Sequence, residues 1–255
     1  MSSLAEIITE RSGRILGVAF NRPAKKNAMT MRMYAAFANL LNDAATDEGI
    51  RVVLVHGTGD SFTAGNDLGD FLKSPPGPGD SPQQRLIEAL INFDKPLVAA
   101  VHGAAVGSGT TMLTHFDFIY AGESAKFQMP FVNLALVPEF GASYSVPAQL
   151  GYLAAAELIL LGSPFDAKRA LELGFVTRVV PDQAVLATAR ETAEKLAQKP
   201  AGALVASKKL LKRSFREHLA AAAKAESEEF TSRVRSAEAK EAFTAFFDKH
   251  RSETR

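Results

Sequence analysis

Residues 95–112, KPLVAAVHGAAVGSGTTM, pass from an apolar run into a glycine-rich turn and then into a segment with helical character. The apolar run is typical of a strand buried on both faces. A turn that opens a helix leaves backbone N–H groups without intrahelical partners, and such groups can bind a phosphate or the negative oxygen of an enolate. The phosphate interpretation fits poorly, because GAAVGSG matches neither G-x-G-x-x-G nor a P-loop. Taken alone, the segment is more often a structural tight turn.

A second loop of the same kind lies upstream. The apolar run RVVLVHG (51–57) is followed by SFTAGNDL (61–68), in which Ala64 and Gly65 lack bulk and Asn66 and Asp67 follow. Two such loops, each placed after a buried strand, predict a pair of backbone donors that converge on one oxygen atom.

The chain around these loops alternates between strand-like and helix-like segments. Residues 15–21 and 116–122 are predicted strands, and 27–47 is a predicted helix with Asn27 as its cap. Repeated strand–helix units imply an α/β fold with a mainly parallel sheet and right-handed crossovers. Residues 73–82, KSPPGPGDSP, are predicted to form a surface loop.

From about residue 183 the chain is almost wholly helical and rich in Ala, Lys, Arg and Glu. This tail is too polar for a second core, so we expect it to pack on the domain or on neighbouring subunits. The expected organisation is a core over residues 1–190 and a helical region over 191–255.

Composition excludes several classes of function. The 255 residues contain no cysteine, which rules out disulfides and a thiol nucleophile, and the net charge of +1 gives no reason to expect nucleic acid as a partner. There is no run of about 18 apolar residues, no signal peptide, and no Ser-Lys-Leu ending, so we expect a cytoplasmic protein that does not enter membranes. His56 and His102 end apolar strands without a second histidine at ligand spacing, so no metal site is expected.

Five blocks in order are similar to the enoyl-CoA hydratase/isomerase (crotonase) superfamily over roughly residues 5–185. The blocks are NRPAKKNAM, SFTAGNDL, KPLVAAVHGAAVGSGTTM, FDFIYA and AKFQMPFVNLALVPEFGASY. The resemblance implies the crotonase (ClpP-like) fold of repeated ββα units, with a C-terminal helical region that forms trimers, often paired into hexamers. It also implies an acyl-coenzyme A thioester as substrate and no further cofactor.

The same resemblance assigns roles to individual residues. The thioester oxygen would lie between the backbone N–H groups of Asn66 and Ser108, which leaves the Asn66 side chain free to vary. Residues implied to contact the substrate or its coenzyme A are Lys25, Lys26, Ala28, Ala64, Gly65, Asn66, Asp67, Leu68, Ser108 and Phe131. For some of these a structural role competes: Lys25 and Lys26 also suit a solvated basic turn, and Asp67 suits a turn or a helix cap.

One acid remains at the family's catalytic positions. Hydratases of this superfamily use two glutamates, and the corresponding residues here are Thr111 and Phe131, which cannot transfer a proton at neutral pH. Glu139, in VNLALVPEFGASYSVP (132–147), follows a strand-like apolar run and resembles the single base of peroxisomal-type Δ3,Δ2-enoyl-CoA isomerases. An apolar setting would raise the pKa of such a carboxyl toward neutrality, which suits a proton shuttle.

The expected activity is therefore isomerisation of a 3-enoyl-CoA to the 2-trans-enoyl-CoA, with Glu139 moving a proton from C2 to C4. Two alternatives stay open: hydration or another crotonase-type reaction of an acyl-CoA, and a non-catalytic acyl-CoA-binding protein. The sequence gives neither the acyl chain length nor the choice between trimer and hexamer.

Overall fold

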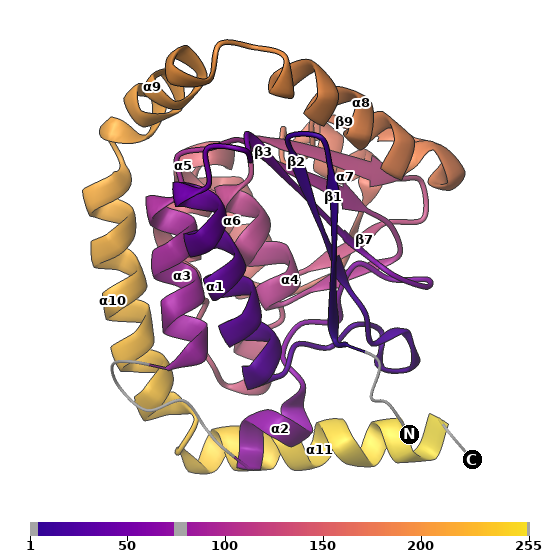
Figure 1. Ribbon diagram of the computed structural model, residues 1–255. Coiled ribbons are helices and arrows are strands. Elements are labelled where there is room, and N and C mark those ends of the chain that lie inside the picture. Colours follow the sequence, from indigo (N-terminus) through magenta and orange to yellow (C-terminus); the bar gives the residue numbers. More distant parts are fainter. Residues whose placement is uncertain (1–4, 74–80, 254–255) are drawn as a thin grey trace.

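A computed structural model describes residues 5–73 and 81–253. Its centre is a six-stranded sheet in the order β1-β2-β3-β4-β6-β9 (Figure 1). The strands are β1 (Ile7–Ser12), β2 (Ile15–Phe20), β3 (Val52–Gly57), β4 (Leu97–Val101), β6 (Phe118–Gly122) and β9 (Arg178–Val180). Within this sheet only the β1–β2 pair is antiparallel; β2, β3, β4, β6 and β9 run parallel. The prediction of a mainly parallel sheet is confirmed, whereas β1 was not anticipated.

Both faces of the large sheet are covered. Alternate strand residues such as Val53 and Val55 pack with helices α1 (Met31–Thr46) and α3 (Pro82–Asn92). Their neighbours Val52 and Leu54 point the other way and pack against α8 (Val185–Ala197). Burial on both faces explains the nearly continuous apolar runs of β3 and β4.

The cap of α1 differs from the prediction. Thr30, not Asn27, is the N-cap, and its hydroxyl accepts a hydrogen bond from the backbone N–H of Met33. Asn27 has a φ of 55° and is fully buried, and its side-chain amide donates to the carbonyls of Thr58 and Ser61. Asn27 therefore fastens the preceding turn to the loop after β3, and the helix begins four residues later than expected.

A second, three-stranded sheet lies beside the first, in the order β5-β7-β8. Its strands are β5 (Ala104–Val106), β7 (Lys126–Gln128) and β8 (Phe165–Asp166). Short helices complete the core: η1 (Pro23–Lys25), α2 (Leu68–Lys73), α4 (Ser108–Thr111), η2 (Met112–His115), η3 (Val132–Leu134), α5 (Ala142–Leu150), α6 (Tyr152–Leu160), α7 (Ala167–Glu172) and η4 (Asp182–Ala184).

Three loop segments compare with the sequence predictions as follows. The apolar run 132–138 is not a strand but the short η3 followed by irregular chain, in which Ala135 has a φ of 55°. The loop that begins at residue 61 ends in the helix α2. This helix was not predicted, because the glycines in and before it favour a loop. Most of the surface loop predicted over 73–82 lies outside the described residues, and Pro82 already belongs to α3.

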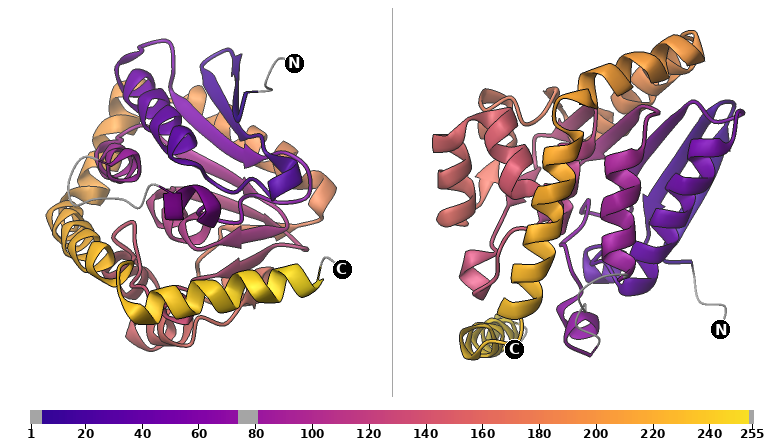
Figure 2. Two further views of the ribbon diagram at one scale, coloured as in Figure 1. Left: turned by 90° about the horizontal axis from the view of Figure 1, so that it is seen from below. Right: turned by 90° about the vertical axis from the view of Figure 1, so that its left-hand side faces the viewer.

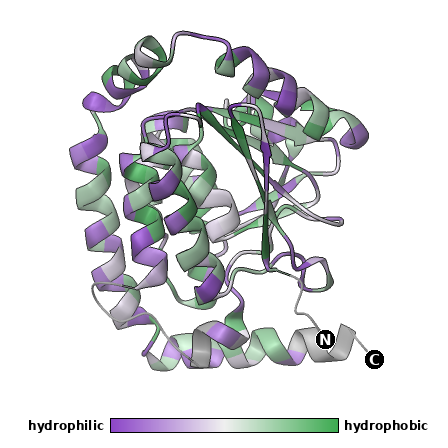
Figure 3. Ribbon diagram, viewed as in Figure 1, coloured by the Kyte–Doolittle hydropathy of each residue, from purple (hydrophilic) through white to green (hydrophobic). Residues whose placement is uncertain are grey.

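The C-terminal helices wrap around the core (Figures 1 and 2). After α8, which spans the expected boundary at residue 190, α9 (Ala201–Arg213), α10 (Arg216–Arg233) and α11 (Ala237–Glu253) follow. Polar and apolar residues alternate along α10, which lies at the side of α3 (Figure 3). Within the described residues, no helix is long and apolar enough to cross a membrane.

Candidate active site

The two glycine loops lie against each other. Thr63 forms a parallel bridge with Ala105 on one edge of β5: its N–H donates to Ala104 O (2.9 Å) and its carbonyl accepts from Val106 N (3.0 Å). Gly65, with a φ of 83°, passes so close to β5 that a Cβ at this position would lie 2.4 Å from Val106 O. Only a glycine permits this approach, which brings residues 64–67 next to the turn at residue 107.

Each loop has a free backbone amide at the position that the resemblance implies. The N–H groups of Gly65 and Asp67 are bound, to Thr63 Oγ1 (3.1 Å) and Met29 O (2.9 Å). In the described part of the chain, the N–H groups of Asn66 and Ser108 donate to no protein acceptor. The predicted pair of donors therefore has the backbone geometry that binding an oxygen atom requires.

Tyr34 links these two residues through their side chains. Its hydroxyl lies 2.6 Å from Asn66 Oδ1 and 2.7 Å from Ser108 Oγ. Since a hydroxyl carries one proton, Tyr34 donates it to Asn66 Oδ1, which can only accept, and accepts from the Ser108 hydroxyl. Burial and the nearby charge of Glu139 raise the pKa of Tyr34 well above its ordinary value, so its hydroxyl stays protonated. Tyr34 comes from the buried face of α1, where a sequence pattern shows only a core residue.

Glu139 is buried beside this pair, with 4% of its surface exposed. Gln83 Nε2 donates to its Oε2 (2.8 Å), and Asn66 Nδ2 donates to its Oε1 (3.3 Å). Burial raises the pKa of Glu139 to about 8, although the two hydrogen bonds act to lower it. The carboxyl can therefore take up and return a proton near neutral pH.

Gln83 was not found from the sequence. It lies on the second residue of α3, just after a segment dense in Pro and Gly, and only the packing of α3 brings it to Glu139. The Asn66 side chain, expected to be free to vary, is engaged with both Tyr34 and Glu139.

A cavity of about 510 Å³ opens in front of the two loops. Its walls include nine of the ten residues expected to contact substrate, namely Lys25, Lys26, Ala28, Ala64, Gly65, Asn66, Asp67, Leu68 and Phe131. The tenth, Ser108, is fully buried behind Gly107, which does line the cavity. Phe230 of α10 and Phe246 and Phe247 of α11 form the opposite wall.

Glu139 lies behind this cavity rather than on its wall. It borders a separate small cavity of about 20 Å³, room for one water molecule, together with Gln83 and Glu226. Asn66 lines the large cavity, and its side chain contacts the Glu139 carboxyl that borders the small one.

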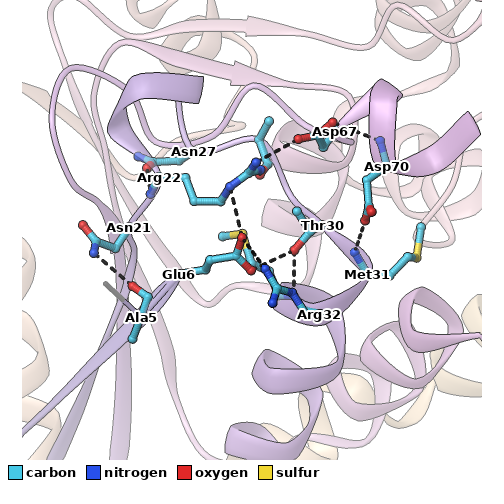
Figure 4. Close-up of polar contacts among 12 residues, drawn as sticks. Ala5, Glu6, Asn21, Arg22, Asn27, Thr30, Met31, Arg32, Asp67 and Asp70 are labelled. Atoms are coloured by element: carbon cyan, nitrogen blue, oxygen red, sulfur yellow. Dashed lines mark hydrogen bonds and ion pairs between the residues drawn. The ribbon is translucent and has the colours of Figure 1, made fainter. Parts of the chain in front are cut away.

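Charged residues near the mouth of the large cavity are mostly structural (Figure 4). Arg22 forms ion pairs with Asp67 (3.0 Å) and Glu6 (3.3 Å). Asp67 Oδ1 also accepts from the N–H groups of Gly69 and Asp70 (both 3.1 Å), which makes it the cap of α2. Partial burial opposes ionisation of Asp67, yet the Asp70 N–H and the Arg22 guanidinium hold its pKa below the ordinary value. The structural interpretation of Asp67 thus fits its contacts.

Lys25 and Lys26 are exposed on and after η1 at the rim of the same cavity. Thr111 is buried, and its hydroxyl donates to Gly107 O (3.2 Å) within its own helix. Phe131 is a buried wall residue. Neither hydratase position therefore carries an acid or a free polar group that faces the cavity.

Known proteins resemble this chain in sequence and in fold. The family model for enoyl-CoA hydratase/isomerase matches residues 10–254. Enoyl-CoA delta isomerase 2 of Rattus norvegicus is 35% identical over 219 residues, which are 84% of this chain and 56% of the relative. A probable enoyl-CoA hydratase of Bacillus subtilis is 34% identical and covers 91% of both chains.

The solved structure of an enoyl-CoA hydratase/isomerase from Pseudoalteromonas atlantica superposes with a TM-score of 0.93 at 38% identity, covering 96% of this chain and 98% of that one. This chain spans little more than half the length of the delta isomerases that it matches. The match to the family model over nearly the full chain, together with the superposition, establishes that the protein belongs to the enoyl-CoA hydratase/isomerase family, within the crotonase superfamily.

Proposed function

We propose that the protein is a Δ3,Δ2-enoyl-CoA isomerase. The observation that carries the proposal is the buried carboxyl of Glu139, with a pKa of about 8, whose Oε1 accepts from the side chain of Asn66, one of the two residues with free backbone amides. Thr111 and Phe131 supply no second acid for the addition of water. Delta isomerases among the relatives support the same choice.

In the proposed reaction the thioester oxygen accepts from the N–H groups of Asn66 and Ser108. Glu139 removes a proton from C2, and the electron pair moves into a dienolate whose negative oxygen the two amides stabilise. A donor of this kind can lower the barrier by about 3–4 kcal/mol. Glu139 then returns the proton at C4, so substrate and product have the same atoms. We expect Lys25 and Lys26, which line the rim of the cavity, to contact the phosphates of coenzyme A.

The test is turnover of 3-hexenoyl-CoA, with the product identified by mass. We expect 2-trans-hexenoyl-CoA with no gain of mass, and a loss of roughly 10²- to 10⁴-fold in Glu139→Gln. Hexanoyl-CoA, which cannot react, should bind the variant as it binds the wild type. The exposed Glu123 offers a matched control, since Glu123→Gln makes the same chemical change away from the site.

Hydration is the second candidate. The cavity of about 20 Å³ beside Glu139 has room for one water molecule, and hydratases are among the relatives. A wild-type product heavier by one water would establish hydration and refute the isomerase. Full activity in Glu139→Gln would remove Glu139 as the base in either reaction, and tight binding without turnover would indicate a non-catalytic acyl-CoA-binding protein.

We also propose that the chain forms trimers, singly or in pairs. The helix α6 leaves Tyr152, Leu153 and Leu160 between 60% and 83% exposed, and Leu210 and Leu211 of α9 are similarly uncovered. Large apolar side chains gathered on one helix are typical of an interface. Light scattering coupled to size-exclusion chromatography would give the mass of the particle, and a monomer would contradict the proposal.

A further inference from the structure

Glu226 is a buried carboxylate that the proposed reaction does not use. It lies on α10 and is 6% exposed. Its Oε2 accepts from Gly141 N (2.7 Å) and its Oε1 accepts from Ser143 N (2.6 Å). These amides open α5, whose N-cap Gly141 has no side chain to satisfy them. A carboxylate from another helix therefore caps α5.

The capped turn is the one that carries Glu139. Phe140 and Gly141, which follow directly, have φ values of 65° and 70°. For a bulky residue such as phenylalanine this backbone conformation is unfavourable, and it persists only where the surroundings hold it. On one side His115 Nε2 donates to Phe140 O (2.8 Å). On the other side Glu226 binds the two amides, so the turn is fixed at both ends.

Helix α10 lies directly against this turn. A Cβ on Gly141 would lie 2.4 Å from Leu219 Cδ1, and Leu219 belongs to the buried face of α10. Glu139 and Glu226 also border the same cavity of about 20 Å³, and the charge of Glu226 acts to raise the pKa of Glu139. Glu226 thus contacts the backbone of the Glu139 turn and influences its carboxyl through space.

We propose that Glu226 is a positioning residue for Glu139: by binding Gly141 N and Ser143 N it holds the strained turn that presents the Glu139 carboxyl beside Asn66. This inference rests on the proposed role of Glu139 as the base. It assigns a function to α10 beyond covering the core, because the same helix supplies Phe230, one turn after Glu226, to both cavities.

Several other titratable groups lie on the elements packed around Glu226. His115 on η2 has a pKa lowered to about 4 by burial, so it stays neutral where Glu139 titrates. Tyr144 of α5 contacts His218 of α10. Helix α3 contributes Arg85 and Glu88, and α9 contributes Lys208 and Lys212, whose charges act on His115. On α10 itself, Lys224, Glu228 and Glu229 complete the charged set near residue 226.

The experiment compares Glu226→Gln with Leu219→Ala. A glutamine offers one acceptor oxygen, so its NH₂ group faces one of the two backbone N–H groups. Leu219→Ala loosens packing beneath the same turn but keeps both hydrogen bonds. For Glu226→Gln we expect kcat to fall roughly 10- to 100-fold with little change in KM, because a hydrogen-bond pair to a charged group is lost away from the coenzyme A contacts. The acid limb of the kcat profile should move to lower pH, since a negative charge near Glu139 is removed.

A readout without turnover separates this inference from the proposed function. In protein labelled with ¹³C at glutamate side chains, the carboxyl signal that Glu139→Gln removes is followed against pH. We expect it to titrate at lower pH in Glu226→Gln than in the wild type or in Leu219→Ala. If the wild type does not isomerise 3-hexenoyl-CoA, the titration still decides the role of Glu226. An unchanged titration, or the same change in Leu219→Ala, would overturn the proposal.

Discussion

The side-chain amide of Asn66 donates to the carboxylate of Glu139, from Nδ2 to Oε1 over 3.3 Å. The same residue offers its backbone N–H to the large cavity, and its Oδ1 lies 2.6 Å from the Tyr34 hydroxyl. One residue therefore connects the candidate oxyanion donors with the candidate base. This connection means that the position and the protonation of Glu139 depend on the loop that would bind the thioester oxygen.

Removing either donor to Glu139 should raise its pKa further. Gln83→Leu deletes the 2.8 Å bond and Asn66→Ala deletes the 3.3 Å bond, and both bonds stabilise the ionised form. A hydrogen bond to a charged group is worth about 1.5–3 kcal/mol, or about one to two pH units. The acid limb of kcat/KM should move to higher pH, more in Gln83→Leu because its bond is shorter. This shift is opposite in sign to that expected for Glu226→Gln.

Gln84→Leu is the control for this pair. Gln84 is the neighbour of Gln83 on α3 and borders the same cavity of about 20 Å³, but its side chain donates to Glu88 (3.3 Å) and not to Glu139. Its pH profile should match the wild type. Profiles that coincide for Gln83→Leu, Asn66→Ala and wild type would show that these amides do not act on the ionised Glu139.

The stability of the protein should fall as the pH rises, and Glu139 should cause part of the fall. Its pKa is about 8 in the folded protein and 4.5 in the reference state. Between these values the folded state holds one more proton than the unfolded state. The contribution of Glu139 to the free energy of unfolding is therefore fully present below pH 4.5 and is lost as the pH rises through 8. The loss is at most about 1.4 kcal/mol per pH unit.

Glu139→Gln removes this titration. We expect the variant to unfold at a higher denaturant midpoint than the wild type at pH 8, with a difference that shrinks toward pH 5. Glu226, whose pKa burial raises to about 7, is present in both proteins, and the loss of repulsion between the two carboxylates in the variant acts in the same direction. Parallel stability curves for the two proteins over this range would show that the pKa of Glu139 is not raised.

The contact between the two glycine loops should tolerate no side chain at Gly65. In Gly65→Ala the new Cβ would lie 2.4 Å from Val106 O, and the φ of 83° is unfavourable for alanine. We expect a loss of stability of more than about 1 kcal/mol and a fall in turnover, because the Asn66 N–H moves away from the turn at residue 107.

Gly107→Ala separates the cost of a positive φ from the cost of a steric clash. Gly107 also has a positive φ, of 56°, but a Cβ there meets nothing within 4 Å. It should lose only the cost of the backbone conformation, about 1–3 kcal/mol, and therefore less than Gly65→Ala. Thermal unfolding of both variants measures the difference, and equal losses would show that the approach to Val106 is not tight.

The sequence predicts the sheet and its two loops because strands buried on both faces and glycine turns leave local patterns. The alternation of Val52, Val53, Leu54 and Val55 between two packed faces is one such pattern. Helix α2 and the irregular chain at 132–138 were missed, because glycines hide a short helix and an apolar run does not distinguish a strand from a buried loop.

Some residues of the candidate site could be predicted from the sequence and others could not. Asn66, Ser108 and Glu139 lie in blocks that resemble the family, so they could be named from the sequence. Tyr34 and Gln83 come from helices whose local sequence shows an ordinary buried face, and their contacts arise only when α1 and α3 pack together over the sheet. Such contacts between distant segments carry no local signal, and the same holds for Glu226, which lies 85 residues from Gly141.

The Thr111 hydroxyl should be dispensable. In two-glutamate hydratases an acid is expected at this place, but here the hydroxyl donates to Gly107 O within its own short helix and is fully buried. Thr111→Val keeps the shape and removes that hydrogen bond, at a cost of about 1 kcal/mol in stability. Turnover of 3-hexenoyl-CoA should stay within about threefold of wild type, since Thr111 is not among the residues that line the large cavity and its hydroxyl is bound within its own helix. The assay that identifies products by mass serves here too. A loss of turnover near that of Glu139→Gln, with unfolding still cooperative, would place Thr111 in the chemistry and return hydration to first place, because position 111 would then be acting on water or substrate as the hydratase acid does.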